Sequence, residues 1–244
     1  MMLLLLAAAV QAGPVDNRQD KFGQCVALSQ TDPRAARALA ANWRVTGGVY
    51  FARQCLGLAY VAEKNWVAAA GEFEGAAREA QLAKDKRAAN YWAQAGNAWL
   101  AVGDAGRART ALDAALTAGT LTGLELGEAQ LDHARALVAT GDLDSARTDI
   151  DLALTTAKDD PLAWLLSATL ARRMANPARA KIDIGEALLR SPDDASVQLE
   201  AGNIAAMAGD EAAARTAWGE AARLAPDSDA GRSAVKALAQ FDTK

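Results

Sequence analysis

The sequence predicts an all-α protein built from a row of antiparallel helix hairpins, on three observations. Aromatic residues make up only 5% of the chain although hydrophobic residues make up 51%, and alanine alone accounts for about a quarter. A core of small residues requires closely approaching backbones, which favours helices packed on helices. One alanine pattern recurs five times, and glycine, aspartate and proline stand where helices would end and begin.

Residues 1–12 are expected to form a signal peptide. Residues 3–10 are an unbroken apolar run too short to span a bilayer, and the small residues Val10 and Ala12 fit a cleavage site after Ala12. No Lys or Arg precedes the leucines, so the apolar N-terminus of a cytoplasmic protein is the alternative. The sequence favours an exported, periplasmic protein of a Gram-negative bacterium.

Residues 13–49 are expected to form a diverged hairpin at the start of the row. Pro33 after Asp32 predicts the start of its second helix, because proline suits the first helical position. Cys25 and Cys55 are the only cysteines. In an exported chain such a pair predicts a disulfide, here joining this hairpin to the first clear repeat. Two buried free cysteines are the alternative.

Residues 50–226 contain the repeats. In each copy an alanine is followed four residues later by a bulky apolar residue and three residues after that by another alanine. The copies are Ala69-Phe73-Ala76, Ala108-Leu112-Ala115, Ala146-Ile150-Ala153, Ala180-Ile184-Ala187 and Ala214-Trp218-Ala221. A glycine or alanine precedes each by the same interval, at Gly57, Gly96, Ala134, Ala168 and Gly202. Copies start about 34 to 39 residues apart, the length of a helical hairpin.

Each copy predicts two helices joined by a short turn. Gly103-Asp104, Gly141-Asp142 and Gly209-Asp210 pair a glycine that ends one helix with an aspartate that caps the next. Asn176-Pro177 has the same role, and Pro192 and Pro226 end second helices. Residues 227–244 predict a last, polar-faced helix that would cover the apolar side of the final repeat.

These repeats resemble the tetratricopeptide repeat (TPR) family, whose unit is a 34-residue helical hairpin. The resemblance rests on residues such as Gly57, Tyr60, Trp92, Gly96, Trp99, Trp164, Gly202 and Pro226, together with the repeated alanines. It implies a right-handed α-solenoid of about five clear repeats, preceded by the diverged hairpin and closed by a C-terminal helix.

The composition argues against several function classes. A net charge of -4 disfavours a nucleic-acid-binding role. One histidine and two cysteines are too few for a usual zinc site, and no cofactor motif occurs. His133 has no serine or cysteine nearby, and no serine lies in a nucleophile-elbow motif. We therefore expect no catalytic residue, metal, cofactor or stable membrane insertion.

The resemblance places the binding surface on the first helix of each hairpin, which lines the inner groove of such solenoids. Applied to this chain, it gives the peptide-binding candidates Asn90, Gln94, Asn97, Asp132, Arg135, Thr169, Arg172, Arg173 and Asn203. The same pattern places Phe51, Gln54, Leu58, Glu128 and Glu200 there. Asparagine and glutamine can pair with the backbone of an extended peptide, and arginine with a carboxylate. Ordinary solvated helix positions are the alternative.

The sequence thus favours a non-enzymatic scaffold that binds a protein or peptide segment, within a cell-envelope assembly. One alternative is a structural module that self-assembles into homo-oligomers. The other is an accessory subunit of an envelope enzyme, such as a cytochrome-maturation or cell-wall system.

Overall fold

The computed structural model describes residues 18–241, which contain thirteen α-helices and no strand. The expected signal peptide at residues 1–12 lies outside the described residues. The helices are α1 (Arg18–Thr31), α2 (Pro33–Val45), α3 (Val49–Ala62), α4 (Trp66–Leu82), α5 (Ala88–Val102), α6 (Ala105–Thr117), α7 (Gly123–Thr140), α8 (Leu143–Thr156), α9 (Pro161–Arg173), α10 (Pro177–Arg190), α11 (Ala195–Met207), α12 (Glu211–Leu224) and α13 (Asp229–Phe241).

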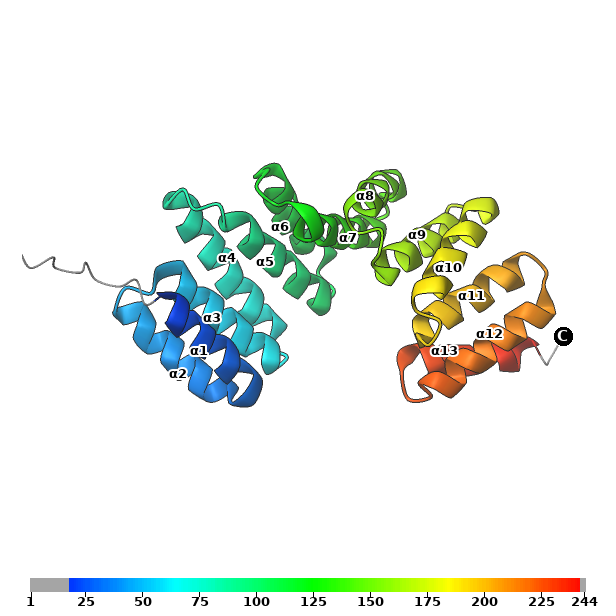
Figure 1. Ribbon diagram of the computed structural model, residues 1–244, viewed down its shortest axis with the longest axis horizontal. Helices are drawn as coiled ribbons and strands as arrows, with labels where there is room; N and C mark the ends of the chain where they lie inside the picture. Colours follow the sequence, from blue (N-terminus) through cyan, green and yellow to red (C-terminus); the bar gives the residue numbers. More distant parts are fainter. Residues whose placement is uncertain (1–17, 242–244) are drawn as a thin grey trace, which may run out of the picture.

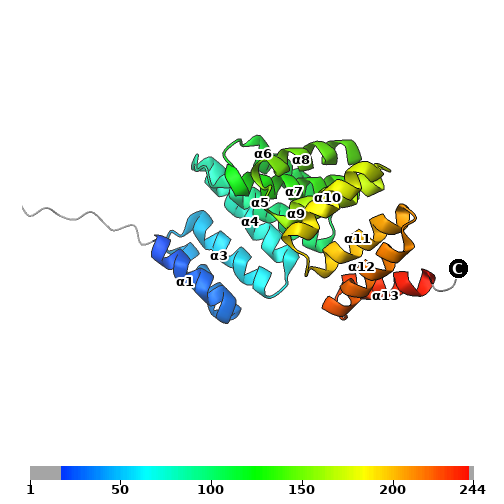
Figure 2. The ribbon, with the colours of Figure 1, turned by 45° about the vertical axis from the view of Figure 1, so that its right-hand side comes forward.

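Each helix packs against the next one along the chain, and the hairpins stack into an arch (Figure 1). From α5 onward the first helices of successive hairpins also touch one another, α5 with α7, α7 with α9 and α9 with α11. In Figure 1 α6 and α8 lie on the outer side of the arch, and α5 and α7 lie nearer its hollow. Figure 2 shows α1 and α13 at opposite ends of the row. The prediction of an all-α solenoid of hairpins is confirmed.

The predicted turn residues end and begin the helices as expected. Gly103, Gly141 and Gly209 each have a positive φ, between 79° and 88°, a conformation that glycine adopts without a Cβ penalty. The following aspartates accept a hydrogen bond from the third residue beyond, as in Asp104, whose Oδ1 accepts from the Arg107 N–H at 3.0 Å. Asn176 caps the helix that starts at Pro177 in the same way.

The repeated alanines are fully buried where helices pack against one another. The first alanines of all five copies, Ala69, Ala108, Ala146, Ala180 and Ala214, have no exposed surface. Within a hairpin the bulky residue lies against the small residue of the first helix. A Cβ added to Gly57, Gly96 or Gly202 would lie 2.4 Å from the side chain of Phe73, Leu112 or Trp218, respectively.

Copies three and four solve the same packing problem differently. Alanine replaces glycine at Ala134 and Ala168, and the bulky residue is Ile150 or Ile184. The extra methyl group of the alanine is therefore matched by a smaller opposing side chain than the Phe73 or Trp218 ring. Copy two lies between these cases, with Gly96 facing the aliphatic side chain of Leu112.

Enlarging one of these alanines should destabilise the protein. We expect Ala108→Leu to lower the free energy of unfolding by about 1–3 kcal/mol, because the added carbons have no space in a contact that is already closed. Ala101→Leu, on the exposed side of α5, is the matched control and should change it by less than about 0.5 kcal/mol. Urea unfolding followed by circular dichroism measures both, and equal midpoints would contradict the assigned packing.

Candidate inner groove

Two adjoining pockets lie on the inner side of the arch, between the first helices of successive hairpins. The larger, of about 290 Å³, lies between α5 and α7. It is lined by Asn90, Ala93, Gln94, Asn97, Leu121, Glu125, Glu128, Ala129 and Asp132. The structure thus brings together four of the peptide-binding candidates, Asn90, Gln94, Asn97 and Asp132, and adds Glu125, which the family pattern does not include.

The polar side chains of this pocket are only partly used within the chain. Asn97 Nδ2 donates to Asp132 Oδ2 at 2.7 Å, and Gln94 Oε1 accepts from Gln54 Nε2 at 3.3 Å. These bonds fix the side chains but leave the Asn97 carbonyl oxygen and the Gln94 amide hydrogens for another partner. Within residues 18–241, Asn90 has no side-chain hydrogen bond.

The α7 wall of the same pocket carries three carboxylates on one helix face. Glu125, Glu128 and Asp132 are three and four residues apart, which places them side by side. The pKa of the Glu128 carboxyl is raised by partial burial, and then by the negative charges of Asp132, Asp160 and Glu125. This spacing was the signal in the sequence that could have identified Glu125.

The second pocket, of about 120 Å³, lies between α7 and α9 and has a different character. Arg135, Thr169 and Arg173 line it together with Ala134, Val138, Ile150, Leu166 and Leu170. Two arginines and a threonine therefore surround an apolar floor. An ion pair between Arg135 Nη1 and Asp132 Oδ1, at 2.8 Å, joins the two pockets.

Two other candidates are engaged in a contact between hairpins. Arg172 on α9 donates to both carboxylate oxygens of Glu200 on α11, at 2.6 and 3.1 Å. Asn203 Nδ2 donates to the same carboxylate, and Asn203 Oδ1 accepts from the indole of Trp218, each at 3.1 Å. Glu200 is only 6% exposed. This network joins α9, α11 and α12, so Arg172 and Asn203 hold the array together.

The placement of Phe51 on the groove is corrected by the structure. Phe51 is buried and packs against Trp43, Tyr50 and Phe22. Leu58 is partly buried against the core, whereas Gln54 reaches Gln94 across the inner side. The family pattern misplaces Phe51 because the diverged hairpin α1–α2 covers the helix that carries it.

The cysteines join two helices at the start of the array. The structure links Cys25 on α1 to Cys55 on α3 by a disulfide, with Cα atoms 5.8 Å apart. Both residues are fully buried, in a cluster with Ala40 and Leu56. The bond attaches α1 directly to the helix that opens the repeats.

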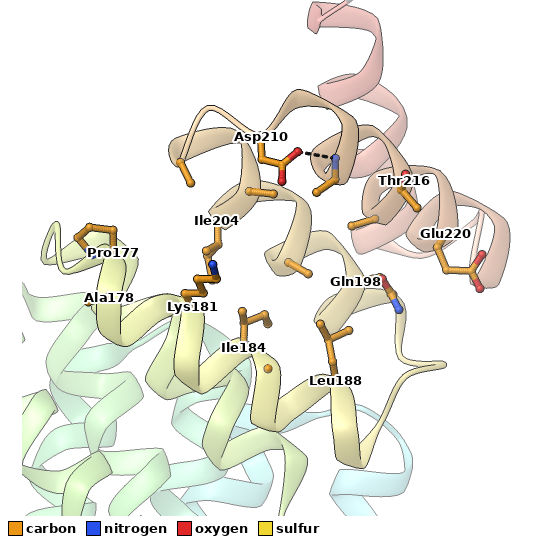
Figure 3. Close-up of a pocket in the computed structure, with 16 residues that line it drawn as sticks. Pro177, Ala178, Lys181, Ile184, Leu188, Gln198, Ile204, Asp210, Thr216 and Glu220 are labelled. Atoms are coloured by element: carbon orange, nitrogen blue, oxygen red, sulfur yellow. Dashed lines mark hydrogen bonds between the residues drawn. The ribbon is translucent and has the colours of Figure 1, made fainter.

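A wide apolar groove of about 910 Å³ lies between α10 and α12 (Figure 3). Its floor is α11, and Ile184, Leu188 and Ile204 point into it. The repeat pattern alone does not predict this groove.

Comparison with another repeat explains why no large side chain of the protein fills this groove. In the α5 hairpin, Trp99 occupies the equivalent space between α4 and α6. Its indole donates to Glu74 on α4 at 2.8 Å, and the Arg107 guanidinium on α6 lies 4.6 Å from its ring. Counting from the repeat glycines, Ala205 stands where Trp99 does, and Gln198 stands where Trp92 does. The two indoles of α5 therefore have no counterpart on α11.

The one histidine has partners within the fold. His133 is 9% exposed, and its Nδ1 lies 2.6 Å from Asp149 Oδ2 and its Nε2 lies 3.1 Å from Asp113 Oδ1. Within residues 18–241, no group of histidine, cysteine, aspartate or glutamate side chains is arranged to hold a metal ion. Each helix of this range is too short or too polar to cross a lipid bilayer.

Fold and inner groove together define a class, the helical-hairpin solenoids that present an extended concave surface. Solved structures specify it further. PilW, described as a widely conserved type IV pilus biogenesis factor, matches with a TM-score of 0.74 and 17% identity over 92% of this chain and 100% of its own. PilF of Pseudomonas aeruginosa matches with a TM-score of 0.69 and 16% identity over 89% and 97%.

A third similar structure is YrrB, described as a TPR protein with an unusual peptide-binding site. It matches with a TM-score of 0.52 and 16% identity over 88% of this chain and 97% of its own. The chain therefore has the tetratricopeptide-repeat fold. By sequence, no protein-family model and no curated protein matches it.

Proposed function

We propose that this protein is a non-enzymatic scaffold that binds an extended segment of another protein in its inner groove. The observation that carries this proposal is the set of hydrogen-bonding groups left unpaired in the α5–α7 pocket, from Asn90, the Gln94 amide hydrogens, Glu125 and Glu128. An extended peptide exposes backbone N–H and C=O groups that such amides can pair. The α7–α9 pocket continues the same surface with an apolar floor for a side chain.

The cellular setting that we propose is a periplasmic envelope assembly. The apolar run at residues 3–10 and the buried Cys25–Cys55 disulfide support export, because structural disulfides persist in oxidising compartments. The similarity to PilW makes pilus assembly the first system in which to seek a partner. The description of YrrB as a TPR protein with a peptide-binding site supports peptide binding by this fold.

Site-specific photo-crosslinking in the producing cell tests the proposal. A photo-reactive amino acid at Gln94 or Thr169 should give covalent adducts with one partner protein, because both positions line the inner pockets. The control position is Leu189 on α10, which is 79% exposed, lines neither inner pocket and should give none. Absence of adducts from both inner positions, or the same adducts from Leu189, would refute binding in the groove.

A further inference from the structure

The charges of the inner groove are sorted by sign along the array. Helix α7 divides them: Glu125, Glu128 and Asp132 line the pocket shared with α5, whereas Arg135 lines the pocket shared with α9. Arg173 adds a second positive charge to the α9 side. A segment lying along the groove would therefore pass first a negative and then a positive region.

The negative region has charge that the fold does not neutralise. Asp132 is paired with Arg135 and bound by Asn97. In contrast, Glu125 and Glu128 have no ion pair or side-chain hydrogen bond within residues 18–241. No lysine or arginine lines the α5–α7 pocket. The ligand group that this pocket fits is a cation, with the α5 amides beside it for the backbone.

The positive region also retains an unused charge. Arg172 is paired with Glu200, and Arg135 with Asp132, but Arg173 has no ion pair or side-chain hydrogen bond within the described residues. Arg173 lines a pocket that also includes the apolar residues Val138, Leu166 and Leu170. This combination fits an apolar side chain followed by a carboxylate.

We propose that the groove recognises an extended protein segment with segregated charges: a lysine or arginine in the α5–α7 pocket, then an apolar side chain, then an acidic residue beside Arg173. The inference rests on the proposed function and narrows it from any peptide to one order of charges. The Asp132–Arg135 ion pair at the boundary keeps the two regions distinct.

Random extended peptides displayed on phage, selected on the purified protein, test this order. The selected peptides should carry basic and acidic residues on opposite sides of an apolar one. With such a peptide labelled by fluorescein, Glu125→Gln/Glu128→Gln should weaken binding by about tenfold or more, because charge-assisted contacts are lost. Arg173→Gln should weaken it similarly and remove the selection for acidic residues. The control, Glu211→Gln/Glu220→Gln on α12, makes the same change in net charge outside both pockets.

The outcomes separate the two proposals. Peptides that bind the groove, as shown by crosslinking from Gln94, but have no sorted charges would overturn the charge order and leave the proposed function standing. Equal weakening by the α12 control would also overturn the charge order, because only net charge would then matter. Failure to select any peptide that crosslinks from Gln94 or Thr169 would overturn both.

Discussion

Cys25→Ala/Cys55→Ala is expected to lower the free energy of unfolding of the oxidised protein by about 3–4 kcal/mol. The two cysteines are 30 residues apart, and opening a loop of this length restores conformational freedom to the unfolded chain. The effect should be concentrated in α1, which the disulfide attaches to α3. Denaturant unfolding followed by tryptophan fluorescence measures the total loss, and hydrogen exchange locates it.

The reductant gives an internal control for this result. A reducing agent should destabilise the parent protein toward the level of the double variant and leave the double variant unchanged. Non-reducing peptide mass spectrometry of exported protein should find Cys25 linked to Cys55. Two free thiols would show that the disulfide does not form. An unfolding midpoint insensitive to reductant would show that it does not stabilise the array.

Arg172→Ala is expected to cost about 3 kcal/mol, because it leaves the buried Glu200 carboxylate without its guanidinium partner. Adding Glu200→Gln should recover much of the loss, since a neutral amide is less costly to bury than a charge. Urea unfolding of the two single variants and the double variant forms the cycle that isolates this pair. Additive losses would mean that the two side chains do not interact in solution.

The neighbouring residue provides the matched comparison. Arg173→Ala removes the same kind of side chain from an exposed position and should change stability by less than about 0.5 kcal/mol. The contrast between Arg172 and Arg173 also decides which variant to use in binding experiments. A loss of binding in an Arg172 variant could come from lost peptide contacts or from lower stability of the fold. A loss of binding in an Arg173 variant reports on peptide contacts alone.

The fold was predictable because its determinants repeat in the sequence at a fixed interval. The helix ends follow from local chemistry at Gly103-Asp104 and Gly209-Asp210, which acts within a few residues. What the sequence shows less directly is which side chains face each other. Gly96 and Leu112 can both be identified in the sequence as repeat positions. That they contact each other is known only from the folded hairpin.

The candidate site was predictable in part because groove positions also recur at the fixed interval of the repeat. The first-helix pattern placed Asn90, Gln94, Asn97 and Asp132 on one surface, and the structure gathers them in one pocket. It could not show that Arg172 is paired, because Glu200 is 28 residues away on the next hairpin. Nor could it place Phe51, whose surroundings depend on the diverged hairpin that covers α3.

The missing indoles on α11 have a mechanical consequence. Trp99 bridges α4 and α6 and so braces three helices of its section, whereas Ala205 leaves α10 and α12 apart across an open groove. Stiffness in a stacked array depends on each junction between neighbours separately. We therefore expect the array to bend more easily at this junction than at the section that Trp99 braces. The limb formed by α11, α12 and α13 would then swing as one body and set the width of the arch's mouth (Figure 1).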